Sequence, residues 1–260
     1  MPSALVDGLH LRWDDDGAGD PPILLVHGWC CDASTLAPQR TFLAARHRVV
    51  APDLPWHGGS AGPAGPPSMD VLLRALAGLC AHLGLDRPVV IGHSMGGALA
   101  LQLATRTAVA PRAVVLLDAR IDAPGGPLHA AREKLVARLR GPGFRDAMRD
   151  VVRRRFSAPD DDAAIVGRVA DLMASAPQEV MVELMSGMNA TDYVADLRAC
   201  PCPVLFIGAS TPVVPLASIA AARPDAALGQ VVGAGHFLPL LVPDQVNAML
   251  RRFLEQRAAR

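Results

Sequence analysis

One pentapeptide limits the choice of fold more than any other part of this sequence: Gly92-His-Ser-Met-Gly96. The β-branched run before it, Val89–Ile91, predicts a short buried strand, and the good helix formers of Ala98–Thr105 predict a helix. Ser94 therefore falls on the turn between them. The two glycines that flank it leave room for a sharp reversal of the backbone. Gly-x-Ser-x-Gly in a strand-turn-helix setting predicts a serine whose hydroxyl points outward.

Bulk composition narrows the class of protein. The chain has 260 residues and 51% hydrophobic content, enough for one sizeable core in a single α/β domain with an insertion. Lys plus Arg and Asp plus Glu both number 25, so no surplus of charge favours nucleic acid or an anionic membrane. No apolar run is long enough to span a bilayer. A small, largely apolar ligand is the expected partner, and the oligomeric state stays open.

The cysteines and glycines argue against a bound metal or cofactor. The cysteines are odd in number and follow no apolar signal segment, which favours a cytoplasmic location. They are Cys30, Cys31, Cys80, Cys200 and Cys202. Their spacing does not match a metal-binding Cys-x-x-Cys, so we expect no metal. Gly233-Ala-Gly235 is not completed to Gly-x-Gly-x-x-Gly, and we expect no dinucleotide or other cofactor.

Strand and helix patterns alternate along most of the chain, which predicts a mostly parallel central sheet with helices on both faces. Strands are expected at 9–13, 23–27, 47–52, 89–91, 113–117, 202–207 and 228–232, and helices at 69–83, 98–105, 216–222 and 243–256. Between 121 and 196 amphipathic helical stretches follow one another without strands. We interpret 121–196 as a helical cap inserted into a core domain made of 1–120 and 197–260.

Two backbone amides are expected to point toward a ligand. The glycine of His27-Gly28-Trp29 follows an apolar strand and lets the chain bend, which frees the Trp29 amide. The Met95 amide begins the helix after Ser94, where N–H groups have no intrahelical partner. The two amides predict a site that stabilises an oxyanion.

At these residues the sequence resembles the α/β-hydrolase superfamily. Four blocks occur in the family's order: His27–Trp29, Asp53–Ser60, Gly92–Gly97 and Gly235–Phe237. The resemblance covers essentially the whole chain. It implies the α/β-hydrolase fold with a nucleophile at Ser94, a general base at His236 and an acid between them in the sequence.

The acid does not stand where this family commonly has it. The stretch after the penultimate strand reads Gly208-Ala-Ser-Thr-Pro212, with Thr211 at the usual position of an aspartate. The carboxylates left between Ser94 and His236 include Asp118, Asp122, Asp192, Asp196 and Asp225. Asp118 ends a core strand next to the serine turn, at the edge where α/β sheets bind ligands. We therefore expect Asp118 to be the acid, with Asp122 as the reserve.

These residues predict an esterase-like hydrolase that cleaves a small, mostly apolar ester, lactone or thioester through an acyl-enzyme. Substrate contacts are expected from His57, Phe237 and Cys30. The methionines of the cap form either an adaptable roof over the substrate or the cap's own core. They are Met173, Met181, Met185 and Met188.

Two other functions remain open. Cofactor-free dioxygenases that act on hydroxyquinolones are similar in having a Gly-Trp-Cys segment, an acid after the earlier strand and a later Ser-Thr-Pro segment. In such an enzyme His236 with Asp118 would abstract a proton, and Ser94 would only bind. The missing late acid also fits a ligand-binding member of the fold with little turnover.

Overall fold

A single mixed sheet organises the chain. The computed structural model describes residues 1–126 and 129–258. Within them the strand order is β1-β2-β4-β3-β5-β6-β7-β8. The strands are β1 Ser3–Val6, β2 Leu9–Asp16, β3 Ile23–Val26, β4 Val49–Pro52, β5 Val89–His93, β6 Ala113–Leu117, β7 Val204–Gly208 and β8 Ala227–Gln230. β1 and β2 are antiparallel to their neighbours, and the other strands pair in parallel. The mostly parallel α/β sheet expected from the sequence is confirmed.

The central strands are apolar because both of their faces are covered. In β3, Ile23 and Leu25 join the core cluster on one face of the sheet, whereas Leu24 and Val26 join the cluster on the other. β6 divides its side chains in the same alternating way. Successive side chains of a strand point to opposite faces, so a run of apolar residues means burial on both sides.

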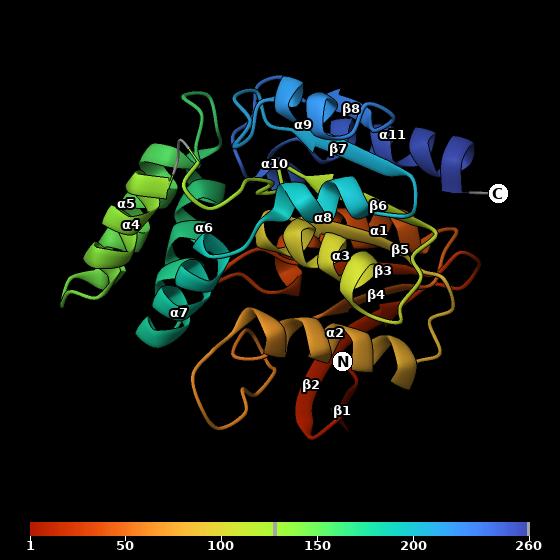
Figure 1. The fold of residues 1–260 in the computed structure, drawn as a ribbon, viewed down its shortest axis with the longest axis horizontal. Coiled ribbons are helices and arrows are strands. Elements are labelled where there is room, and N and C mark those ends of the chain that lie inside the picture. Colours follow the sequence, from red (N-terminus) through yellow and green to blue (C-terminus); the bar gives the residue numbers. More distant parts are fainter. Residues whose placement is uncertain (127–128, 259–260) are drawn as a thin grey trace.

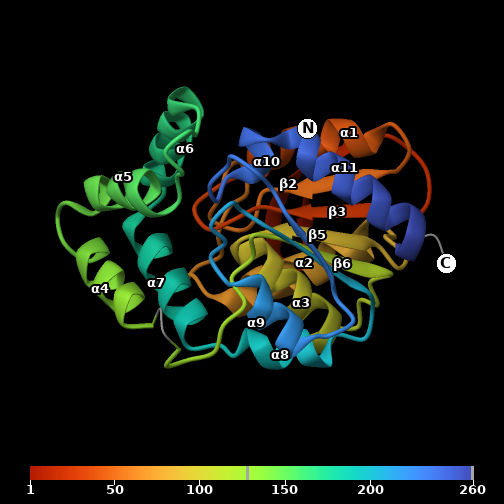
Figure 2. The ribbon, with the colours of Figure 1, turned by 90° about the horizontal axis from the view of Figure 1, so that it is seen from above.

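Helices form a layer on each face of the sheet, as Figures 1 and 2 show. In Figure 2, α1 and α11 lie on one side of the strands, and α2, α3, α8 and α9 lie on the other. Their bounds are α1 Ala37–Ala44, α2 Met69–His82, α3 Met95–Arg106, α8 Tyr193–Ala199, α9 Leu216–Ala222 and α11 Pro243–Phe253. The shorter helical segments are η1 Ala33–Leu36, α10 Leu238–Leu241 and η2 Leu254–Ala258.

Four further helices form a lobe at one end of the sheet, drawn in green and teal in Figures 1 and 2. They are α4 His129–Leu139, α5 Phe144–Arg155, α6 Ala163–Ser175 and α7 Gln178–Asn189. The lobe joins the chain between β6 and α8. The boundary expected at residue 196 falls inside α8, which packs on α3 and is tied to it by an Arg106–Asp196 ion pair of 2.7 Å.

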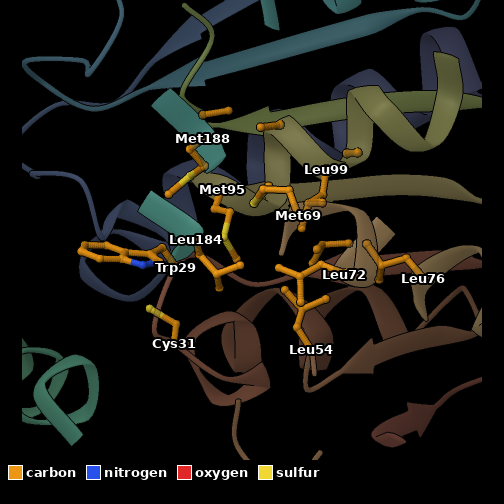
Figure 3. Packing of buried hydrophobic residues seen from close by; sticks show 14 of the residues in the cluster. Trp29, Cys31, Leu54, Met69, Leu72, Leu76, Met95, Leu99, Leu184 and Met188 are labelled. Atoms are coloured by element: carbon orange, nitrogen blue, oxygen red, sulfur yellow. The ribbon is translucent and has the colours of Figure 1, made fainter. Parts of the chain in front are cut away.

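The lobe shares the core of the sheet domain. Figure 3 shows Leu184 and Met188 of α7 beside Trp29 and Met95 of the sheet domain. All these residues belong to one buried cluster. The lobe methionines are buried as well, at exposed fractions of 2%, 0%, 6% and 2% for Met173, Met181, Met185 and Met188. In this structure the methionines therefore fill the interior of the lobe and its junction with the sheet.

Several element bounds differ from those expected. The strand at 113–117 and the helix at 216–222 are confirmed. The helix after Ser94 begins at Met95 instead of Ala98, because the glycines after the turn are buried against the sheet and need no strong helix propensity. β1 and α1 had no counterpart in the sequence interpretation. Among residues 1–126 and 129–258, no helix combines the length and apolar character that crossing a bilayer requires.

Candidate active site

Ser94 lies on a strained turn between β5 and α3. Its backbone angles are φ 54° and ψ −116°, outside the regions that most residues occupy. A Cβ on Gly92 would collide with the backbone of Gly96, so the reversal requires glycine. The Ser94 amide donates to the carbonyl of Leu117 at 3.0 Å, which fixes the turn to the end of β6. The serine side chain is left partly exposed.

Asp118 and His236 are joined although 118 positions separate them. The Nδ1 of His236 lies 2.7 Å from Oδ2 of Asp118. The other carboxylate oxygen accepts from the amides of Ala209 and Val213, each at 3.2 Å. The exposed fractions of Asp118 and His236 are 1% and 5%. The carboxylate is thus held at three points, and it fixes one edge of the imidazole ring.

His93 connects the serine turn to the histidine. Its Nε2 donates to the backbone carbonyl of His236 at 2.9 Å, and the two rings lie 4.7 Å apart. Gly28 packs on the other side, where an added Cβ would lie 3.4 Å from Cβ of Ser94. Within the described part of the chain the Ser94 hydroxyl makes no hydrogen bond. The structure therefore brings Asp118 to His236 and holds Ser94 beside them without a direct bond.

The segment Gly28-Trp29-Cys30 turns sharply next to the serine. Cys30 has φ 55°, and its amide donates to Nε2 of His57 at 3.2 Å. Among the residues described, the amides of Trp29 and Met95 donate to no other group. Both amides are therefore unpaired donors, and an oxyanion hole would need two such groups.

Two buried histidines connect this segment to residues 54–55, because each ring bonds to the segment with one nitrogen and to Leu54 or Pro55 with the other. His57 Nδ1 donates to the carbonyl of Pro55 at 2.8 Å, and His27 Nδ1 donates to Gly28 at 2.8 Å while its Nε2 accepts from Leu54 at 3.0 Å. Burial lowers the pKa of His27 to about 4 and that of His57 to about 3. Burial also raises the pKa of the Cys30 thiol. Both rings therefore stay neutral at pH 7 with their nitrogens already hydrogen-bonded, and the thiol stays protonated.

The reserve acid Asp122 and the other carboxylates considered from the sequence have other partners. Asp122 pairs with Arg120 at 2.9 Å and also with Arg132. Asp225 pairs with Arg223 at the surface, and Asp192 accepts from the amide of Ala195 at the start of α8. Among the described carboxylates, Asp118 is the one that bonds to His236.

Aromatic rings surround the imidazole. Phe237 is buried and lies 5.4 Å from the His236 ring. Phe156, at the end of α5, lies 4.7 Å from it at an interplanar angle of 36°. The sequence interpretation did not single out Phe156, because nothing near it in the chain marks a contact 80 positions away. Within the described residues no cluster of three or more His, Cys, Asp or Glu side chains could hold a metal ion.

Known proteins match this chain over most of its length. A dihydrolipoyllysine-residue acetyltransferase component of an acetoin cleaving system from Pseudomonas putida is 28% identical, over 97% of this chain and 69% of that protein. A thermophilic esterase from Thermogutta terrifontis superposes with a TM-score of 0.86 at 26% identity, covering 99% of this chain and 98% of its own. An enol-lactonase from Burkholderia xenovorans LB400 gives a TM-score of 0.85 at 25% identity, covering 98% and 100%.

A protein-family model also matches most of the chain. The model described as the alpha/beta hydrolase family matches residues 23–249, from β3 to α11. That span includes the serine turn, the Asp118–His236 pair and the free amides. The chain belongs to the alpha/beta hydrolase family.

Proposed function

We propose that this protein is a serine hydrolase that cleaves a small, mostly apolar ester, lactone or thioester with Ser94, His236 and Asp118. The observation that carries the proposal is the 2.7 Å contact between His236 Nδ1 and Asp118 Oδ2, beside a serine on a strained turn. A carboxylate at Nδ1 fixes the ring tautomer, so that Nε2 can accept a proton from the serine. The helices within 121–196 serve as a cap over this site.

The reaction proceeds through an acyl-enzyme. Ser94 Oγ attacks the acyl carbonyl as its proton passes to Nε2 of His236, and Asp118 stabilises the imidazolium. The oxyanion is held by the amides of Trp29 and Met95. His236 then protonates the leaving group as the bond to the acyl carbon breaks. Water then attacks the acyl carbon as its proton passes to His236. The bond between the acyl carbon and Ser94 Oγ breaks, His236 returns the proton to Ser94, and the acid is released.

The substrate class rests on relatives and on the site's surroundings. Relatives with 25% identity or more include proteins described as an esterase and an enol-lactonase. Phe237 and Phe156 place aromatic surface beside the imidazole, which suits an apolar acyl group. Substrate contact by Phe237 belongs to this proposal. The ring nitrogens of His57 and the amide of Cys30 bond to protein groups, so these residues would meet a substrate through carbon or sulfur.

A fluorophosphonate tests whether the serine is activated. We expect the folded protein to gain one adduct on Ser94, detected by mass spectrometry, and to lose hydrolysis of 4-nitrophenyl acetate in step. Ser94→Ala should gain no adduct, and Ser34→Ala, at an exposed serine outside the proposed triad, should be labelled like the parent protein. Absence of an adduct on a folded sample would refute the acyl-enzyme mechanism.

Within the described residues the Ser94 hydroxyl makes no hydrogen bond, and this observation favours one alternative function, that of a cofactor-free oxygenase. A cofactor-free oxygenase would use His236 and Asp118 to deprotonate the substrate, and its serine would need no hydrogen bond to the histidine. Hydrolysis should collapse in both Ser94→Ala and His236→Ala, because each supplies an essential proton or bond. Consumption of O₂ with a hydroxyquinolone that survives Ser94→Ala but not His236→Ala would instead identify the oxygenase.

A further inference from the structure

The connection between α5 and α6 contacts the loop that carries His236. We call residues 156–162 the α5–α6 loop and residues 233–237 the histidine loop. The His236 amide donates to the carbonyl of Phe156 at 2.8 Å, and the Gly235 amide donates to Oδ1 of Asp161 at 2.9 Å. Two consecutive amides of the histidine loop are thus bound by the lobe. Figure 2 shows α5 and α6 in that lobe, beside the sheet domain.

The contact extends to the reactive ring. The Phe156 ring lies 4.7 Å from the imidazole of His236 at an interplanar angle of 36°, a tilted stack. Asp118 holds the Nδ1 edge of the same ring, so the ring is constrained both at its edge and on a face. Ring contacts of this kind restrict the side-chain rotation that would carry Nε2 away from a serine.

The two loops fit together with no spare room. A Cβ added to Gly235 would lie 2.6 Å from the Phe156 carbonyl oxygen and 2.8 Å from the amide nitrogen of Ala158. Both atoms belong to the backbone and cannot rotate aside. Glycine at this position therefore allows the close approach of the two loops, and any larger residue would push them apart.

The α5–α6 loop is itself held firmly. Oδ2 of Asp161 accepts from the Ala158 amide at 2.8 Å, so this side chain bridges its own loop and the histidine loop. The Ser157 hydroxyl donates to the carbonyl of Val152 at 2.9 Å, which attaches the loop to the end of α5. The α5–α6 loop that contacts His236 is therefore an ordered turn. The position of this turn determines where the imidazole ring lies.

We propose that Phe156 and Asp161 are positioning residues for His236, a role that rests on the proposed function of His236 as general base. Through them the lobe completes the geometry of the base. It does so from a segment inserted after β6, far in sequence from the residues that it orients. A rearrangement of the α5–α6 loop would move the imidazole, so the chemical step depends on the docked state of the lobe.

Substitutions in the α5–α6 loop separate positioning from simple attachment of the lobe. Asp161→Ala removes the acceptor of the Gly235 amide, and Phe156→Leu removes the ring that stacks on His236. We expect each to lower kcat for 4-nitrophenyl acetate about 10- to 100-fold, the range seen when reacting groups are misplaced by about 1 Å. KM should stay within about threefold, because the Asp161 carboxylate binds the histidine loop and not the ester, and leucine keeps an apolar surface at position 156. The rate of fluorophosphonate labelling at Ser94 should fall by a similar factor.

The neighbouring Asp162 provides a matched control. Its carboxylate accepts from the amides of Ala164 and Ile165 at the start of α6 and does not contact the histidine loop. Asp162→Ala removes the same chemical group from the same loop and should leave kcat within about twofold. Asp161→Asn keeps an oxygen that can accept from Gly235, and it should recover much of the rate lost in Asp161→Ala. Circular dichroism and thermal melting establish that each variant is folded.

The outcomes of these experiments distinguish failure of the positioning role from failure of the proposed function. Wild-type kcat and labelling rates in folded Asp161→Ala and Phe156→Leu would overturn the positioning role, as would an equal loss in Asp162→Ala. The His236→Ala variant tests the premise separately. If it labels and hydrolyses like the parent protein, the proposed function fails and the positioning role fails with it. If it is inactive while the loop variants are unaffected, the proposed function stands and only the positioning role is lost.

Discussion

Three residues of the candidate site have backbone angles that side chains other than glycine rarely adopt. Cys30, Ser94 and Asp118 have φ values of 55°, 54° and 40°. Ser94 and Asp118 directly follow strands β5 and β6, and Cys30 lies in the segment that follows β3. At each of these positions the chain changes direction at the candidate site. Such strain persists where the surrounding structure holds it, and it gathers at functional positions. At Asp118 the two amides that donate to its Oδ1 hold the residue in this conformation.

Asp118→Asn tests the orienting role of the carboxylate. Asparagine keeps the size of the side chain but presents an uncharged amide to His236, which disfavours the productive tautomer and the imidazolium. We expect kcat for 4-nitrophenyl acetate to fall about 10³- to 10⁴-fold, with little change in KM.

The control for Asp118→Asn is Asp225→Asn, at an exposed aspartate paired with Arg223. It should change kcat less than about twofold, since surface pairs contribute little. An Asp118→Asn protein that keeps a tenth or more of the parent kcat would mean that another group orients the histidine.

The unit of strand, turn and helix around Ser94 depends on close packing of backbone on backbone. The start of α3 lies so close to the ends of β5 and β3 that a Cβ on Gly92 would collide with the Gly96 backbone, and a Cβ on Gly96 would collide with the backbone of Val26 and His27. Not every glycine of the chain is under this restriction. Gly167, in α6, would place a Cβ in open space. Substitution by alanine should therefore lower the free energy of unfolding at Gly92 and raise it at Gly167.

Gly92→Ala and Gly167→Ala form a matched pair for stability. At Gly92 the new methyl group would meet the backbone of Gly96, and we expect a loss of about 3 kcal/mol or more in the free energy of unfolding. At Gly167 alanine improves helix propensity, and we expect a gain of about 0.5–1 kcal/mol. Urea denaturation followed by circular dichroism measures both. Equal effects at the two positions would refute the close approach of α3 to the end of β5.

Besides His236, the described part of the molecule buries three histidines where the sheet meets its loops, His27, His57 and His93. Burial lowers the pKa of His27 to about 4 and that of His57 and His93 to about 3. The unfolded chain takes up protons at these positions near pH 6.5, whereas the folded protein does not. Their contribution to stability is thus complete above about pH 6.5 and is lost as the pH falls toward 4.

We therefore expect the free energy of unfolding to decrease by about 4 kcal/mol between pH 7.5 and 5.5, or about 1.4 kcal/mol for each histidine. Urea denaturation at several pH values measures the slope. His57→Gln should reduce it by about a third, whereas His10→Gln, at an exposed position, should leave it unchanged. A stability that stays constant over this range would show that the three rings are not buried in their neutral form.

Much of the architecture follows from patterns a few residues long. The β-branched run of β5, the glycines beside Ser94 and the helix formers after them suffice to predict that turn, since its sterics are local. The apolar runs of β3 and β6 predict central strands for the same reason. Edge strand β1 and helix α1 were not predicted, because short elements at the margin of a sheet have a weak hydrophobic pattern.

By itself the sequence determined the serine turn, the parallel core and a short list of aspartates, because these depend on neighbours along the chain. Only the tertiary structure decided which aspartate meets His236, which nitrogens of His57 are already bonded, and that Phe156 and Asp161 contact the histidine loop. Those contacts join residues 27 to 118 positions apart. Their partners are chosen by the packing of whole elements, and no local spacing encodes that choice.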